Sequence, residues 1–182
     1  MVDAAAFNVV QVGVVVSDVR ATMKTYHELF GWGPWYVYEY KRPWFHDSEL
    51  HGEPVEFSML GAEVQVGPMW FELIQPLEGP SIYKEWLESH GEGVHHLMVG
   101  WDFEMGEGDA APPPQSDRAI EIERKAEMMR EKFAKLGVGV LMGGRLGSTS
   151  QFYYLDTEPI LKVILEAGGG HPSDLLPIEI YP

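Results

Sequence analysis

Residues 8–16 read NVVQVGVVV, a nearly continuous valine run. A run of this length and composition predicts a strand that is covered on both faces. Ser17 and Asp18 then offer N-caps for a helix whose apolar positions recur every three or four residues from Val19 to Phe30, and Gly31 suits its C-terminus. The chain therefore opens with a strand followed by a helix.

The same order of elements is predicted twice. After the first helix come strand-like segments at 35–38, 55–60 and 69–75, with a loop around residues 43–54. The second set is a strand at 94–101, a long helix from Ser116 or Asp117 to Gly137, and strands at 138–142, 151–156 and 161–166. We therefore expect an α+β fold of two tandem βαβββ modules.

These elements define the expected organisation of the chain. We place a first module at 1–78, a connecting helix at 79–92, a second module at 93–168 and a tail at 169–182. A Pro-rich insertion at 104–117 interrupts the second module. The tail carries Leu175, Leu176 and Ile178, so we expect it to lie on the neighbouring module or on a second subunit.

The composition narrows the functional classes. The chain has 182 residues, 45% of them hydrophobic, which is enough for a large core. Its formal net charge of −15 opposes nucleic acid and anionic membranes as partners. Cysteine is absent, so a metal would need nitrogen and oxygen ligands. The sequence shows neither a leader pattern nor a long apolar run, and we expect a cytoplasmic protein.

Polar side chains lie inside several predicted strands. Glu72 follows MWF, His95 and His96 precede LMV, Glu166 follows VIL, and Gln11 stands among the valines. A carboxylate removed from water costs several kcal/mol unless it is paired or bound to a metal. Because Gln11 and Glu72 belong to one module and a His and Glu166 to the other, the repeat predicts one four-ligand pocket between the modules.

Other interpretations of these residues are open at this point. Glu72 and Glu166 could be edge residues or partners of a core Arg, and Gln11 could be a satisfied core amide. Neighbouring strand residues point to opposite faces, so only one of His95 and His96 is expected to enter the pocket. The aromatic residues between Trp32 and Phe45 could line a substrate pocket or simply pack a long loop over the sheet.

The chain resembles the vicinal oxygen chelate superfamily, which includes glyoxalase I, methylmalonyl-CoA epimerase and extradiol dioxygenases. The resemblance covers nearly the whole chain and rests on VGVVVSD (12–18), YHELFG (26–31), FELIQPL (71–77), GEGVHH (91–96), YLDT (154–157) and ILE (164–166). It implies a cupped, mostly antiparallel sheet around a metal pocket. The metal positions it implies are Gln11, Glu72, His96 and Glu166, binding one divalent ion such as Mg, Mn, Co, Ni or Zn.

The resemblance also implies an activity. It is strongest to methylmalonyl-CoA epimerase and glyoxalase I-like members. In an epimerase of this type the metal stabilises an enolate beside a carbonyl group, and the resemblance implies Glu166 as the first proton-transferring base and Glu56 as the second. For Glu56, a solvent-facing strand position is an equally good interpretation. The implied substrate is a small molecule, either an aromatic compound or a thioester, and a homodimer is expected because modules of this superfamily often pair between chains.

Two alternatives to an epimerase remain. Gln11 favours a glyoxalase I-type lyase. The aromatic content favours a metal-free protein that sequesters an aromatic or hydrophobic compound. A lyase would need basic groups for the carboxylates of glutathione, and a CoA epimerase would need them for phosphates. The evident candidates for either role are Lys41, Arg42 and Arg145. Gln11 and Glu72 argue against dioxygenase chemistry, which requires two His and one carboxylate.

Overall fold

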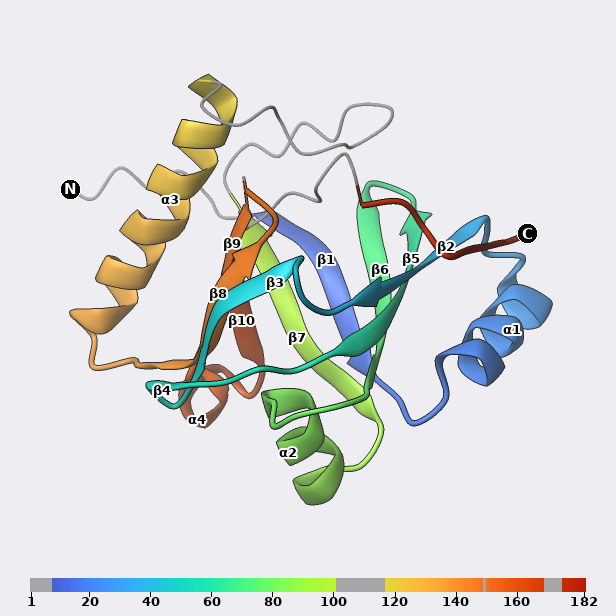
Figure 1. The fold of residues 1–182 in the computed structure, drawn as a ribbon, viewed down its shortest axis with the longest axis horizontal. Coiled ribbons are helices and arrows are strands. Elements are labelled where there is room, and N and C mark those ends of the chain that lie inside the picture. Colours follow the sequence, from blue (N-terminus) through green and yellow to red (C-terminus); the bar gives the residue numbers. More distant parts are fainter. Residues whose placement is uncertain (1–7, 101–116, 149, 169–174) are drawn as a thin grey trace.

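The computed structural model describes residues 8–100, 117–148, 150–168 and 175–182. Its first half contains β1 (Asn8–Val15), α1 (Val19–Phe30), β2 (Trp35–Tyr40), β3 (Phe45–Leu50), β4 (Glu53–Pro54), β5 (Met59–Val66), β6 (Met69–Pro76) and α2 (Ile82–Ser89). The second half contains β7 (Gly93–Gly100), α3 (Asp117–Ala134), β8 (Val140–Leu146), β9 (Ser150–Leu155), α4 (Glu158–Leu161), β10 (Ile164–Gly168) and β11 (Glu179–Tyr181). Figure 1 shows these elements in sequence colours.

The helices begin and end where local chemistry predicts. The Asp18 side chain accepts a hydrogen bond from the backbone N–H of Ala21, and Gly31 ends α1 in the left-handed conformation. Ser81 caps α2 in the same way, through the N–H of Lys84. The expected capping of α1 by Asp18 and Gly31 is therefore confirmed.

All strands join one open, mostly antiparallel sheet in the order β11-β2-β5-β6-β1-β7-β10-β9-β8-β3-β4. The first module contributes β2-β5-β6-β1 and the second contributes β7-β10-β9-β8, so the two modules repeat the same order outward from the centre. In each module the first and last strands are parallel neighbours, and β1 and β7 join the modules as an antiparallel pair. The predicted α+β repeat is confirmed.

The structure corrects the sequence prediction between residues 41 and 58. This segment, which we call the strap, contains β3 and β4 where a loop was expected, and the next strand begins only at Met59. The strap crosses in front of the central strands and pairs with β8 at the far edge of the second module (Figure 1). The sequence of β3, FHDSEL, has four consecutive polar residues and lacks the apolar-polar alternation by which a strand is recognised.

The described part of the tail packs against the rest of the same chain. Its last strand, β11, pairs with β2 of the same chain, so this part packs on its own first module. The first residues of the tail and nearly all of the Pro-rich insertion at 104–117 lie outside the described residues. Within the described part, no helix has the length and apolarity needed to cross a membrane.

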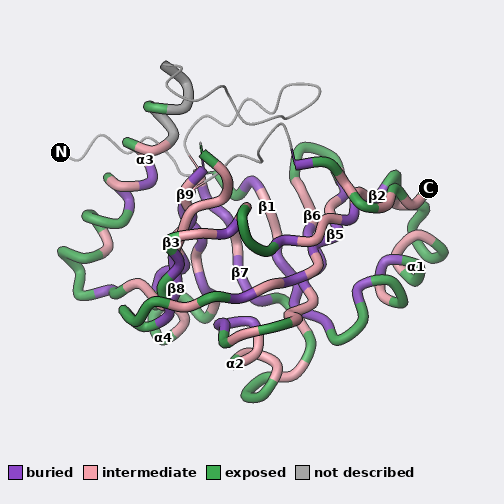
Figure 2. The backbone as a smooth tube through the Cα atoms, viewed as in Figure 1, coloured by how far each residue is buried: buried purple, intermediate pink, exposed green. Residues whose placement is uncertain are grey.

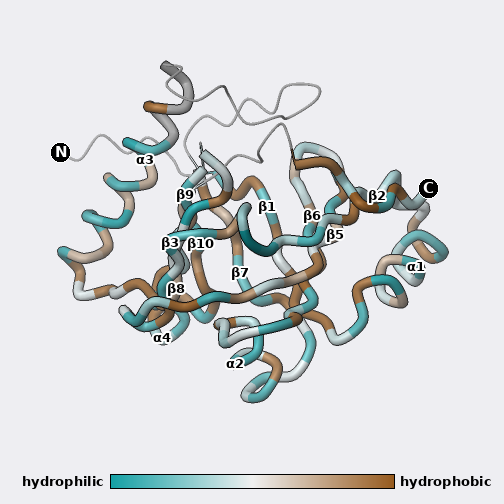
Figure 3. The backbone as a smooth tube through the Cα atoms, viewed as in Figure 1, coloured by the Kyte–Doolittle hydropathy of each residue, from teal (hydrophilic) through white to brown (hydrophobic). Residues whose placement is uncertain are grey.

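The sheet separates two outer cores from a central one. On one face, α1 packs on the first module and α3 on the second. Figure 2 shows the central strands buried and the outer sides of the helices exposed, and Figure 3 shows the matching hydropathy. On the other face lies the central cluster, made of Val15, Tyr40, Phe45, Leu50, Phe57, Met59, Ile74, Ile82, Tyr83, Met142, Phe152, Tyr154, Ile164 and Leu175.

Candidate metal centre

The strand register brings the four predicted ligands to one face of the sheet. Glu72 on β6 and His96 on β7 both pair with Gly13 on β1, so the three residues share one row. The next row on the same face contains Gln11, Met98 and Glu166. This is the face that carries the central cluster, because Val15 and Ile74 continue the same alternation.

Three of the four side chains come close together. The Nε2 atom of His96 lies 2.9 Å from Oε2 of Glu166 and 3.9 Å from Oε2 of Glu72. All three residues are buried, with His96 at 0% exposure, Glu72 at 6% and Glu166 at 8%. Gln11 is half-buried, one row away from Glu72 and His96.

The close approach between His96 and Glu166 is not a hydrogen bond. Both His96 Nε2 and Glu166 Oε2 are buried without a hydrogen-bond partner, because the short distance lacks the required alignment. Buried polar atoms are normally satisfied, so each such exception requires an explanation. These two orphaned atoms face each other from β7 and β10 of the second module.

Gly13 makes this arrangement possible. A Cβ atom at this position would lie 1.9 Å from Cε1 and 2.3 Å from Nε2 of His96. The imidazole therefore occupies the space that any side chain at residue 13 would fill. A glycine inside an otherwise valine-rich strand is a signal of such a close approach, and the sequence interpretation did not use it.

A β-bulge changes the expected orientation of the paired histidines. Gly13 pairs with His96 but Val14 pairs with Val94, so His95 is the extra residue. The two rings consequently lie in contact, with Nδ1 of His95 2.9 Å from Nδ1 of His96. The prediction that the side chains of His95 and His96 point to opposite faces of the sheet is therefore wrong. The bulge places both rings beside Tyr154.

His95 is fully buried in an aromatic box formed by Tyr83, Trp86 and Tyr154. Burial lowers the pKa of His95 well below its ordinary value, and the neighbouring His96 and His90 lower it further. His95 is therefore neutral. One of its nitrogens bonds to His96, and the other, Nε2, has no hydrogen-bond partner.

A further carboxylate, Glu63, stands beside the site. It pairs with Glu72 across β5 and β6, and the Tyr40 hydroxyl donates a hydrogen bond to its Oε1 at 2.5 Å. Burial raises the pKa of Glu72 well above its ordinary value, and the charges of Glu63 and Glu166 raise it further. Sequence reasoning missed Glu63, because a single Glu in an alternating strand is typical of a solvent-facing position.

Glu56 does not join this group. Its side chain is 69% exposed and lies 3.0 Å from the guanidinium of Arg42. The neighbouring Phe57 enters the central cluster instead. The structure therefore corrects the expectation that Glu56 acts within the pocket, and the physical reason is the alternation of the backbone around Phe57.

The buried donor atoms have the chemistry that a divalent cation requires, although they are not arranged around a common point. Within the described ranges, no three His, Asp or Glu side chains form a ready-made metal site. The donor set still fits a cation, because two buried carboxylates surround an imidazole and both orphaned atoms are metal-binding types. A hard or borderline divalent ion would satisfy these atoms together.

Comparisons with known proteins agree with this architecture. A family model described as Glyoxalase/Bleomycin resistance protein/Dioxygenase superfamily matches residues 10–103. No curated protein matches the chain.

Among solved structures, a hypothetical protein from Bacillus halodurans C-125 is 15% identical with a TM-score of 0.52, covering 88% of this chain and 92% of that one. Methylmalonyl-CoA epimerase from Mycobacterium tuberculosis is 16% identical with a TM-score of 0.50, covering 90% and 87%. A Streptomyces coelicolor methylmalonyl-CoA epimerase in complex with 2-nitronate-propionyl-CoA is 22% identical with a TM-score of 0.48, covering 89% and 96%. The first two likenesses show the fold alone.

Proposed function

Because this chain belongs to the glyoxalase/bleomycin resistance protein/dioxygenase superfamily, we propose that it is a metal-dependent isomerase or epimerase that moves a proton beside a carbonyl group. In this proposal Glu72, His96 and Glu166 hold one divalent ion, and Gln11 supplies a fourth, neutral oxygen. The observation that carries the proposal is the pair of orphaned buried atoms, His96 Nε2 and Glu166 Oε2, which face each other from the neighbouring strands β7 and β10, with the buried Glu72 of the other module beside them.

The bound ion would stabilise negative charge on a substrate oxygen as the neighbouring carbon loses its proton. Glu166 is the proposed proton acceptor, because its buried carboxylate lies beside His96 and has a second oxygen besides the Oε2 atom that would bind the ion. Without a cation, burial favours the protonated form of Glu72, so binding of the ion would release that proton.

Inversion at carbon needs a second proton carrier on the opposite face of the substrate. We assign this role to Glu63 rather than to Glu56, because Glu63 shares a row with Glu72 whereas Glu56 is exposed. Tyr40 orients the Glu63 carboxylate through its hydroxyl group. With only one of the two carriers the site would exchange a proton without inverting the carbon.

One observation favours a second candidate function. The central cluster is rich in aromatic rings, and the described residues lack a ready-made metal site. A protein that sequesters an aromatic compound without turnover would share these two features. It would not explain why two carboxylates are buried beside His96.

Metal binding tests the proposed function. We expect the purified chain to bind about one Mn²⁺ or Co²⁺ ion, and His96→Ala or Glu72→Ala to weaken binding by about 100-fold or more, because a ligand is lost outright. Isothermal titration calorimetry measures both values. Matched controls are His51→Ala and Glu56→Ala, which remove exposed residues of the same types. If all of these proteins bind the ion equally, or none does, the metal enzyme is wrong.

The expectations of a homodimer and of a cytoplasmic location stay predictions. The exact reaction, that of an isomerase or of a lyase, also stays a prediction. An exchange assay that measures the deuterium content of the recovered substrate would distinguish the two.

A further inference from the structure

We propose that the substrate of this site is a small, phosphate-free carbonyl or carboxylate compound with an aromatic or other apolar body, and that it is not a CoA thioester. The inference deepens the proposed function and rests on it, since it concerns the ligand of the same site. Two independent features carry it: the strap that covers the site and the pairing of the cations around it.

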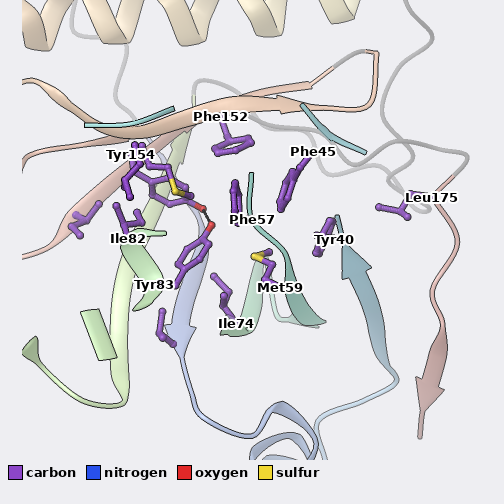
Figure 4. Close-up of a cluster of buried hydrophobic side chains, with 14 residues drawn as sticks. Tyr40, Phe45, Phe57, Met59, Ile74, Ile82, Tyr83, Phe152, Tyr154 and Leu175 are labelled. Atoms are coloured by element: carbon purple, nitrogen blue, oxygen red, sulfur yellow. Dashed lines mark hydrogen bonds between the residues drawn. The ribbon is translucent and has the colours of Figure 1, made fainter. Parts of the chain in front are cut away.

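The strap places aromatic rings in the middle of the concave face. Phe45 stacks on Phe57 with ring centroids 4.6 Å apart and on Tyr40 at 5.5 Å, and it also contacts Phe152 of the second module at 5.5 Å. Figure 4 shows Phe45 and Phe57 side by side between Tyr40 and Phe152. The strap thus fills the space between the modules with apolar rings.

These rings adjoin the proposed metal ligands. Tyr154 belongs to the same cluster as Phe45, pairs with Glu166 across β9 and β10, and lies 5.1 Å from the His96 ring. The ligand side chains themselves are almost completely buried. A compound that reaches them must replace ring contacts with its own surface. An aromatic or apolar body can do so at low cost, whereas a hydrated polar chain would lose its water without compensation.

The cations of the strap and its rim already have carboxylate partners. Lys41 lies 2.9 Å from Glu39, and Arg42 lies 3.0 Å from Glu56. Arg145, which pairs with the strap through His46, lies 2.9 Å from Glu123. These are the three residues that the sequence offered as phosphate ligands.

Paired cations make a poor phosphate site. A CoA thioester carries several negative charges on its nucleotide, and at these three cations they would compete with a carboxylate that already lies within ion-pair distance. The formal net charge of −15 adds repulsion over the whole surface. Lys84 beside α2 does not change this balance, since Glu85 and Glu88 line the same hollow. A ligand that has no phosphate avoids these costs.

Binding of two probe sets tests the inference. The first set is phenylpyruvate, benzoylformate and mandelate, which are phosphate-free aromatic 2-oxo and 2-hydroxy acids; the second is CoA and methylmalonyl-CoA. Calorimetry with the full chain, with and without Mn²⁺, compares the two sets. We expect at least one acid to bind at least 10-fold more tightly than either CoA compound.

Two variants sharpen the test. Phe45→Ser removes a strap ring and should weaken binding of the acids about 10-fold or more. The triple variant E39Q/E56Q/E123Q frees the three cations, changes only partly exposed side chains, and should raise the affinity for CoA at least 10-fold while leaving the acids unaffected. The triple variant keeps the inference testable if Phe45→Ser fails to fold.

The inference is overturned if either CoA compound binds the unsubstituted chain as tightly as the best acid, or if no acid binds. The proposed function fails separately, through the absence of metal binding or through its indifference to His96→Ala. Preferential binding of an acid that is the same with and without Mn²⁺ would support this ligand class and count against the metal enzyme.

Discussion

The orientation of one imidazole determines whether this site can bind a cation. His96 Nε2 faces Glu166 and Glu72, and its Nδ1 bonds to Nδ1 of His95. A hydrogen bond between two imidazole nitrogens contains one proton, which one ring donates and the other accepts. The tautomer of His95 therefore fixes which nitrogen of His96 carries a proton and which has a free lone pair. When His96 Nδ1 donates, Nε2 is free to act as a ligand. In the proposed metal site, His95 would therefore be a positioning residue for His96.

Substitution of His95 should change the metal affinity without removing a ligand. We expect His95→Leu to weaken Co²⁺ binding by about 10- to 100-fold, the usual effect of losing a partner that orients a metal-binding His. His95→Asn, whose side-chain oxygen can accept the same hydrogen bond, should keep most of the affinity. Chelator competition measures the affinities, and ¹⁵N shifts of His96 report its tautomer. Equal affinities for the two variants would exclude a positioning role.

At the scale of elements, β1 and β7 build the site between them. The bulge at His95 turns both rings to one side, and Gly13 on the facing strand leaves the space that His96 fills. Because β1 also pairs with β6, Gly13 lies between Glu72 on β6 and His96 on β7. Residue 13 has no side chain that would stand between these two. The metal centre therefore depends on a strand position that contributes no ligand.

Gly13→Ala should consequently abolish the site. Its methyl group would overlap the His96 ring, so we expect the free energy of unfolding to fall by about 1–3 kcal/mol and metal binding to be lost. Gly139→Ala is the matched control, because nothing lies within 4 Å of its new Cβ atom. Urea unfolding and calorimetry provide the two readouts. A Gly13→Ala protein that binds the ion normally would contradict the dependence of the site on Gly13.

At the scale of the whole molecule, buried and surface charges act together on stability. The chain carries a formal net charge of −15, and three carboxylates, Glu63, Glu72 and Glu166, meet near its centre. A carboxyl group whose pKa is raised in the fold binds its proton more tightly when folded. Its stabilising effect is present at pH values below the unfolded-state pKa and is lost as the pH rises through the folded-state pKa.

The pH dependence of stability should reveal Glu72. In the metal-free protein, we expect Glu72→Gln to become increasingly stable relative to the unsubstituted chain as the pH rises above 4.5, the ordinary pKa of a Glu carboxyl group, by at most about 1.4 kcal/mol per pH unit. The lowered pKa of His95 has the opposite slope in both proteins and cancels in the difference. Urea unfolding with a chelator present, from pH 5 to pH 8, measures the difference. Glu56→Gln is the control, and a flat difference for Glu72→Gln would contradict the raised pKa.

The local pattern of the chain was sufficient to predict the repeated modules, because valine runs, helix periodicity and caps such as Asp18 are properties of short segments. It also identified Glu72, His96 and Glu166 as anomalous polar residues in apolar strands, and the register later brought them to one face. The local pattern did not predict the strands of the strap, the place of Glu63 beside the site or the exposed position of Glu56.

Those features depend on contacts between distant parts of the chain. Pairing of β3 with β8 is a long-range choice that six residues of β3 do not encode, and Glu63 matters only because Tyr40 and Glu72 face it. Local sequence thus determined which elements form and which polar residues are unusual. Only the tertiary structure decided which of them meet, because strand register and the bulge at His95 arise from packing of the whole sheet.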